Sequence, residues 1–141
     1  MIYITRRETF NAAHKLWNPD WSAEKNKEVF GKCANENWHG HNYVLFVTVK
    51  GRIGDDTGFV INLKQLSRII KDYVFDLVDH KNLNMDVDFL KGQITSSENF
   101  AKAIWDQLDQ PIKESGGKLA KIVLEETQNN IVEYYGGQQP Y

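Results

Sequence analysis

The chain has 141 residues, of which 41% are hydrophobic and 26% charged, and this length and composition predict one soluble globular domain over residues 1–141. Its 17 basic and 19 acidic side chains leave a net charge of −2, which argues against partners such as nucleic acid or an anionic membrane. A single cysteine, no apolar run near the roughly 18 residues of a membrane span, and no signal-peptide pattern together indicate a cytoplasmic setting.

The first third of the chain predicts two strands separated by a long polar loop. Residues 2–14 alternate like a strand, and residues 39–53 form a run of β-branched and aromatic side chains that is typical of another strand. Between them, residues 15–38 predict a loop with one helical turn at 23–28. A loop of this length inside a compact domain usually has a function.

Two amphipathic helices are expected next. Residues 63–78 carry apolar side chains at helical spacing on one face. A second helix is predicted to begin near Thr95, where a Thr/Ser cap followed by Glu98 reads as a capping box, and Pro111 is expected to limit it.

Two short strands, at residues 119–127 and 130–135, complete the predicted elements, and the tail at 136–141 is expected to fray. The order strand–strand–helix–helix–strand–strand predicts an α+β fold in which two helices cover one face of a four-stranded antiparallel sheet. The other face then needs a partner, so we expect the chain to form oligomers.

The segment His39-Gly40-His41 indicates a metal site. Strand side chains alternate, so both imidazoles point to the same face, and His14 ends the other predicted strand. Three neutral imidazoles leave a fourth zinc position open, which is typical of catalytic sites, although copper, nickel and iron also bind imidazole. The alternative is that each histidine is an ordinary core or surface residue, since spacing alone does not show that the two strands are neighbours.

Cys33 lies in the polar loop beside Lys32. A nearby ammonium or metal ion would favour its thiolate, which acts as a base or a nucleophile. A buried inert thiol is the alternative.

Asp79 and His80 lie where the first helix is expected to end. One interpretation is a carboxylate that orients a proton-transferring histidine, and the other is a simple helix C-terminal cap. Adjacent residues on a helix do not face each other, so the first interpretation requires the helix to have ended.

Acidic residues at two places in the sequence remain as candidates for the site. Glu98 is explained as a capping residue. In the strand at 119–127, one of Glu125 and Glu126 should point inward. A buried carboxylate needs partners, and a heterocycle edge with adjacent N–H donors would supply two hydrogen bonds.

These residues, in this order, resemble the 6-pyruvoyl tetrahydropterin synthase family over nearly the whole chain. The motifs that carry the resemblance are Phe10-Asn11-Ala12-Ala13-His14, Phe30-Gly31-Lys32-Cys33, His39-Gly40-His41-Asn42-Tyr43, Thr57-Gly58-Phe59-Val60-Ile61-Asn62-Leu63, Leu77-Val78-Asp79-His80-Lys81-Asn82-Leu83-Asn84, Ser96-Ser97-Glu98-Asn99 and Glu126-Thr127.

The resemblance implies the tunnelling fold, whose subunits join their strands into a barrel as trimers stacked into a homohexamer, with sites at subunit interfaces. It implies a Zn²⁺ cofactor and a pterin substrate, 7,8-dihydroneopterin triphosphate. The implied residues are the zinc ligands His14, His39 and His41, the catalytic residues Cys33, Asp79 and His80, the pterin anchor Glu126 with Ser96 and Glu98 nearby, and Lys15, Lys32, Arg6 and Arg7 as candidates for the triphosphate.

The sister enzyme of queuosine biosynthesis, 6-carboxytetrahydropterin synthase, shares these residues and releases acetaldehyde as well. The five residues between Cys33 and His39 favour the pyruvoyl-forming type, while Trp38 and the tryptophan-rich loop at 17–21 depart from the expected family pattern. A non-catalytic zinc-binding module and a cysteine hydrolase that uses Cys33 and His80 are the alternatives from other classes.

Overall fold

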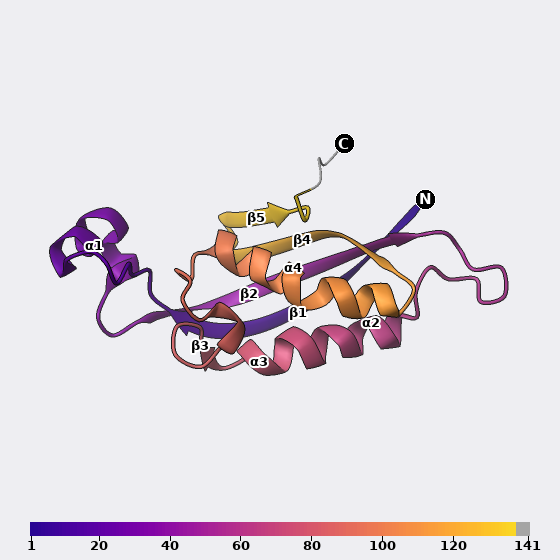
Figure 1. The fold of residues 1–141 in the computed structure, drawn as a ribbon, viewed down its shortest axis with the longest axis horizontal. Helices are drawn as coiled ribbons and strands as arrows, with labels where there is room; N and C mark the ends of the chain where they lie inside the picture. Colours follow the sequence, from indigo (N-terminus) through magenta and orange to yellow (C-terminus); the bar gives the residue numbers. More distant parts are fainter. Residues whose placement is uncertain (138–141) are drawn as a thin grey trace.

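A computed structural model describes residues 1–137 and confirms an α+β fold. Its elements in chain order are β1 (Ile2–His14), α1 (Ala23–Phe30), the 3₁₀-helix η1 (Gly31–Ala34), β2 (His39–Gly51), α2 (Leu63–Ile70), the π-helix η2 (Lys71–Phe75), α3 (Asp76–Val78), β3 (Lys81–Asn82), the 3₁₀-helix η3 (Asp88–Leu90), α4 (Ser97–Glu114), β4 (Lys118–Thr127) and β5 (Asn130–Tyr134). Helices α2, α3 and α4 lie across one face of a single sheet (Figure 1).

The sheet has five strands in the order β3-β1-β2-β4-β5, rather than the four predicted. The two long strands β1 and β2 are antiparallel neighbours, and their register pairs His14 with His39 and Ala12 with His41. The additional strand β3 has two residues and runs parallel to β1. So short a strand carries no hydrophobic periodicity, and the sequence pattern therefore gave no sign of it.

The helix predicted over residues 63–78 is present as α2, η2 and α3. One continuous buried face, formed by Leu66, Ile70, Val74 and Val78, packs on the sheet. In the π-helical turn, the carbonyl of Tyr73 accepts a hydrogen bond from the side chain of Gln107 on α4 (3.3 Å). The helix ends at Val78, as expected.

Helix α4 differs from its prediction at both ends. The N-cap is Ser96, whose hydroxyl accepts a bond from the Asn99 amide, so the predicted capping box of Thr95 with Glu98 is wrong. Pro111 lies inside the helix rather than ending it. Because Ile112 is fully buried in the core, its packing favours a helical chain beyond the proline.

Helix α1 lies beyond the end of the sheet at which β1 finishes and β2 begins (Figure 1). Its N-cap Ser22 accepts a bond from the Lys25 amide. Asn26 is fully buried and bonds to the backbone of Asn18, Trp21 and Ser22, which makes the predicted polar loop an ordered structure. In the predicted tail, residues 136 and 137 form a turn, and 138–141 lie outside the described residues.

Among residues 1–137, no helix combines the length and the apolar character needed to cross a bilayer. The core lies between the helices and one face of the sheet, with β2 contributing Tyr43, Leu45, Val47 and Val49 to it. The opposite phase of β2 points to the uncovered face of the sheet. The expected partner for that face stays a prediction.

Candidate active site

The three histidines singled out by the sequence meet at one end of the sheet. His14 ends β1, while His39 and His41 begin β2, and the antiparallel register places all three side by side. One ligand atom from each lies within 4.8 Å of the others, so this trihistidine group could hold a metal ion. Long-range strand pairing supplies the adjacency that sequence spacing alone did not establish.

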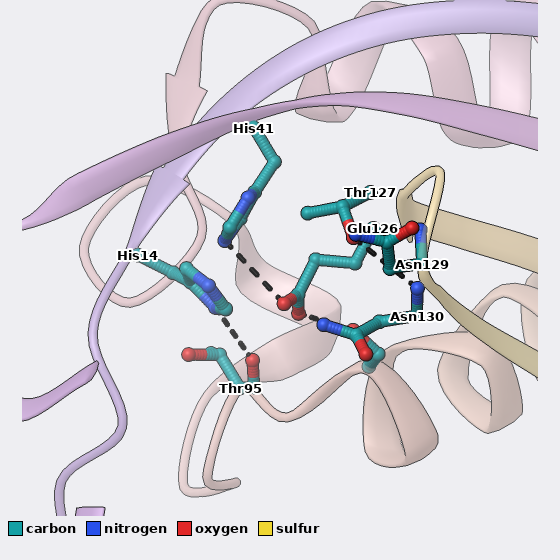
Figure 2. Close-up of polar contacts among 8 residues, drawn as sticks. His14, His41, Thr95, Glu126, Thr127, Asn129 and Asn130 are labelled. Atoms are coloured by element: carbon teal, nitrogen blue, oxygen red, sulfur yellow. Dashed lines mark hydrogen bonds and ion pairs between the residues drawn. The ribbon is translucent and has the colours of Figure 1, made fainter. Parts of the chain in front are cut away.

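His14 is fixed in orientation by the chain itself. It is 1% exposed, and its Nδ1 lies 2.7 Å from the carbonyl oxygen of Thr95 (Figure 2). A carbonyl only accepts, so Nδ1 carries the proton and Nε2 presents its lone pair. This arrangement is typical of metal-ligating histidines, whose second nitrogen bonds to a carbonyl or carboxylate.

Burial keeps the imidazoles in the form that binds metals. It lowers the pKa of His14, and the neighbouring His39 and His41 lower it further, against the opposing effects of Thr95 and Glu126. Burial and His41 also lower the pKa of His39. At neutral pH both rings are therefore neutral, as metal ligation requires.

Three ring nitrogens of the group are buried without a hydrogen-bond partner among the described residues: His14 Nε2, His39 Nδ1 and His41 Nε2. Unpartnered buried polar atoms are costly and call for an explanation. A metal ion bonded to this donor set would satisfy them, so the residues fit a bound metal. Three protein ligands also leave a coordination position for water or substrate.

Glu126 points at the trihistidine group from β4 (Figure 2). Its Oε1 lies 3.6 Å from His41 Nε2, beyond hydrogen-bond distance, and its Oε2 accepts a hydrogen bond from Ser97 Oγ. The β4–β5 register shifts between Glu125 and Thr127, which leaves Glu126 as an extra residue. Glu126 shares the inward phase of β4 with the buried Ile122 and Leu124, so the alternation of the strand decides which of the two glutamates faces the site.

Glu126 also lines a hollow of about 390 Å³, which we call the Glu126 pocket. Its lining residues are Leu16, Ser96, Ser97, Glu98, Glu126, Asn129, Asn130, Ile131 and Val132. The structure thus brings together the three residues expected to bind substrate. Ser97 was missed as a site residue, although it lies next to the serine and glutamate that were noticed.

Cys33 lies half-buried in η1. Its carbonyl accepts a bond from the amide of Leu16 (2.7 Å), which holds this turn against the chain two residues beyond His14. Within the described residues, the group able to share a metal contains the three histidines and not Cys33.

Asp79 and His80 form the expected pair. Asp79 is extended, His80 has φ of 59°, and Asp79 Oδ2 lies 2.9 Å from His80 Nδ1. Their position is fixed by Asn11, whose amide donates to Asp79 Oδ1 (3.2 Å) and whose carbonyl accepts from the His80 amide (2.7 Å). Because the helix has ended, the carboxylate can orient the imidazole.

His80 of this pair lines a different hollow, of about 590 Å³, which we call the strand-end hollow. It is lined by Asn11, Ala12, Ala13, Gly40, His41, Asn42, His80, Lys81, Asn82 and Asp86, and shares no lining residue with the Glu126 pocket. The side chain of His80 is 74% exposed. Within one chain, His80 and Glu126 therefore line different hollows, while His41 lines the hollow of His80 and lies 3.6 Å from Glu126.

The basic candidates are widely spread. Arg6 pairs with Glu8 (2.9 Å), and Arg6 and Arg7 precede His14 by roughly 25 Å of extended strand at about 3.3 Å per residue. Lys32 is exposed in η1. Lys15 directly follows His14, and its ammonium lies over two tryptophan rings.

These features define an α+β protein with a trihistidine group that could hold a metal ion, beside a carboxylate-lined pocket. The family model described as 6-pyruvoyl tetrahydropterin synthase matches residues 3–137. The chain belongs to this family.

Named relatives agree over nearly the full length. The chain is 44% identical to a 6-pyruvoyl tetrahydrobiopterin synthase of Dictyostelium discoideum, covering 96% of each chain. It is 43% identical to the Homo sapiens protein of that name, covering 94% of this chain and 90% of the relative. The solved structure of Caenorhabditis elegans 6-pyruvoyl tetrahydropterin synthase superposes with a TM-score of 0.90, at 38% identity and 96% coverage of each chain.

A protein named for the sister activity matches less of the chain. The 6-carboxy-5,6,7,8-tetrahydropterin synthase of Bacillus subtilis is 33% identical over 85 residues, which is 58% of this chain and 54% of that protein.

Proposed function

We propose that this protein is a zinc-dependent lyase that converts 7,8-dihydroneopterin triphosphate into 6-pyruvoyl tetrahydropterin with loss of triphosphate. The observation that carries the proposal is the carboxylate of Glu126 facing a trihistidine group, at 3.6 Å from His41, beside a pocket. Membership of the family and the named relatives support the same activity.

Zinc is the proposed metal, held by His14, His39 and His41, because a buried trio of neutral imidazoles with an open position suits it. When bound, Zn²⁺ acts as a Lewis acid that makes protons on neighbouring substrate groups easier to remove. The bond from His14 to the Thr95 carbonyl holds its ring for this task.

Glu126 is the proposed anchor for the pterin ring. A carboxylate accepts two parallel hydrogen bonds, which matches the 2-amino and N3 edge of a pterin. The hydroxyl of Ser97 holds Oε2 of this carboxylate in place. Ser96 and Glu98 line the same pocket, so they are proposed to contact the substrate as well.

Proton transfer is assigned to Cys33 and to His80. In this proposal the Cys33 thiolate takes a proton from the substrate side chain, and His80, oriented by Asp79 at 2.9 Å, carries a proton to or from it. Because His80 is exposed and lies in the strand-end hollow, its transfer needs a second copy of the chain to bring the groups together. We therefore propose a homo-oligomer, a hexamer of two trimers, acting in the cytoplasm.

The test is mass-spectrometric analysis of products after the zinc-loaded protein is incubated with 7,8-dihydroneopterin triphosphate. A 6-pyruvoyl product with released triphosphate is expected. Unchanged substrate from a zinc-loaded oligomer would contradict the proposed activity and favour a non-catalytic metal module. Activity that survives complete chelation would favour cysteine-based chemistry without a metal.

The same experiment distinguishes the proposed activity from the second candidate function, the carboxy-forming activity. That reaction releases acetaldehyde, which is measured independently in the reaction mixture. The five-residue spacing from Cys33 to His39 and the higher identity to the pyruvoyl-named relatives favour the first activity. A 6-carboxy product would move the reaction to the sister branch and leave the proposed site residues unchanged.

A further inference from the structure

Lys15, which directly follows His14 in the chain, has its ammonium group over the rings of two tryptophans. Its Nζ lies 4.4 Å from the ring centroid of Trp38 and 5.1 Å from that of Trp17. Indole faces attract an ammonium ion through their negative quadrupole, most strongly where water is partly excluded. All three residues are partly buried, so the flexible lysine side chain is restricted to a narrow region.

The backbone of Lys15 is fixed to the same support as the metal-binding histidine. Its amide donates to Asn84 Oδ1 (3.1 Å), and its carbonyl accepts from Asn84 Nδ2 (2.9 Å) and from Thr95 Oγ1 (3.2 Å). Thr95 is also the residue whose carbonyl orients His14. The backbone of Lys15 is thus fixed by hydrogen bonds to Asn84 and to Thr95, the residue that also orients His14.

Trp38 adopts an unfavourable backbone conformation next to His39. Its φ is 67°, in the left-handed region, where a bulky side chain is rare and strained. The amide of Trp38 bonds to the carbonyl of Asn35 (3.2 Å), which closes the turn that holds it. Strained residues persist where the surroundings require them, and they gather at ligand sites.

The charge of Lys15 is not neutralised by the chain. Within residues 1–137, no carboxylate lies within 4.0 Å of its Nζ, whereas Lys71, Lys91, Lys102, Lys113 and Lys121 each pair with an acidic residue. The two indoles stabilise the cation without accepting a conventional hydrogen bond, so its N–H donors stay available to an anion.

We propose that Lys15, steadied by Trp17 and Trp38, binds the phosphate chain of the substrate and thereby selects the triphosphate ester over the unphosphorylated pterin. The inference rests on the proposed function for the identity of the substrate. It assigns a specificity role to Lys15, the one basic candidate that adjoins a metal-binding histidine in the sequence. It also gives a role to two tryptophans that the catalytic scheme leaves unused.

The test measures binding in a Cys33→Ala background, so that zinc-loaded protein holds its ligands without turnover. Equilibrium dialysis gives the dissociation constants of 7,8-dihydroneopterin triphosphate and of 7,8-dihydroneopterin. Lys15→Met should weaken binding of the triphosphate at least about 10-fold, the cost of losing a hydrogen-bonded charge contact, and change binding of the unphosphorylated pterin less than about twofold.

Lys25→Met is the matched control. Lys25 makes the same kind of contact, with Nζ 4.4 Å from the Trp21 ring, but it lies on α1 and does not adjoin a histidine in the sequence. It should leave both dissociation constants unchanged. Lys15→Arg keeps the charge and the stacking, so it should restore most of the affinity for the triphosphate.

Trp38→Gly tests the aromatic support, since glycine accepts the left-handed backbone and removes only the indole. It should weaken binding of the triphosphate by about threefold, which is the size of a partly exposed cation–π contact. Equal losses for both pterins, or no loss with Lys15→Met, would overturn the inference while leaving the proposed function intact. If neither pterin binds the zinc-loaded protein, the proposed function fails together with it.

Discussion

Two regions of this molecule carry the candidate chemistry, and they differ in how complete a single chain makes them. Within the chain, His14 of the trihistidine group donates a hydrogen bond to the Thr95 carbonyl, and Glu126 accepts one from the Ser97 hydroxyl. Cys33 lies half-buried in a short turn, and His80 is 74% exposed in a separate hollow. The chain therefore positions the proposed metal ligands and the proposed pterin anchor through its own packing, and leaves the proposed proton-transfer groups more exposed.

Packing explains the difference. His14 lies on the face of β1 that the helices cover, where Thr95, just before α4, meets its ring. Asp79 and His80 follow the end of α3 and are held through the backbone, by hydrogen bonds with Asn11 and from the Asp79 amide to the Phe75 carbonyl. A residue fixed at its backbone but exposed at its side chain can be completed by a neighbouring copy.

The largest expected effect is loss of zinc, which we expect from a substitution in the trihistidine group but not from one at His80. His41→Ala should abolish stoichiometric zinc binding and lower turnover by more than the roughly 10–100-fold that loss of an outer-shell partner costs. His80→Ala should keep the zinc and still lose activity. Metal analysis and turnover of both variants check this, and loss of zinc from His80→Ala would show that the regions are not independent.

A large loss is also expected at the pterin anchor. Glu126→Gln should weaken substrate binding by about 10–100-fold, because a charged acceptor of two hydrogen bonds becomes a neutral one, and should leave zinc in place. Glu125→Gln is the control, since Glu125 lies in the regular ladder opposite Ile131. Similar losses in both variants, measured as KM, would contradict the assignment of Glu126.

Oligomers that combine two inactive variants, one from each region, should show a smaller but more specific effect. If His80 of one copy serves Glu126 of another, oligomers that combine His80→Ala chains with Glu126→Gln chains contain some intact sites. Coexpressed chains should then regain part of the activity that each variant lacks alone. Coexpression without any recovery would place both groups of each site in one chain.

The smallest effect concerns pH. Burial lowers the pKa of His14 and His39 below the ordinary value of 6.5, so the unfolded chain binds more protons than the folded chain as the pH falls below that value. The free energy of unfolding of the metal-free protein should therefore decrease from pH 7.5 to pH 5.5, as urea titrations would measure. His39→Asn should flatten this dependence, and an unchanged slope would argue against a neutral, buried His39.

Much of the fold and the trihistidine group could be predicted, because the sequence signals that indicate them are local. Long alternating strands, an amphipathic helix ending at Val78 and a His-x-His pair are each read within a short window of sequence. Their contacts then follow from one antiparallel pairing, His14 with His39.

What the sequence did not reveal depends on long-range packing. The bulge at Glu126 appears only in the register with β5, and Pro111 remains helical because of the buried core beneath Ile112. The hydrogen bond from Ser97 to Glu126 joins residues from α4 and β4. The separation of Asp79 and His80 from the Glu126 pocket is likewise a property of the folded surface.

The place of Glu126 on β4 makes the site depend on strand parity as well as on chemistry. Alternate residues of a strand face opposite ways, so deleting Glu125 would move Glu126 to the face opposite the buried Leu124. A chain that kept every functional residue type could thereby lose its pterin anchor. In the evolution or redesign of this strand, changes of length should be tolerated less well than changes of side chain.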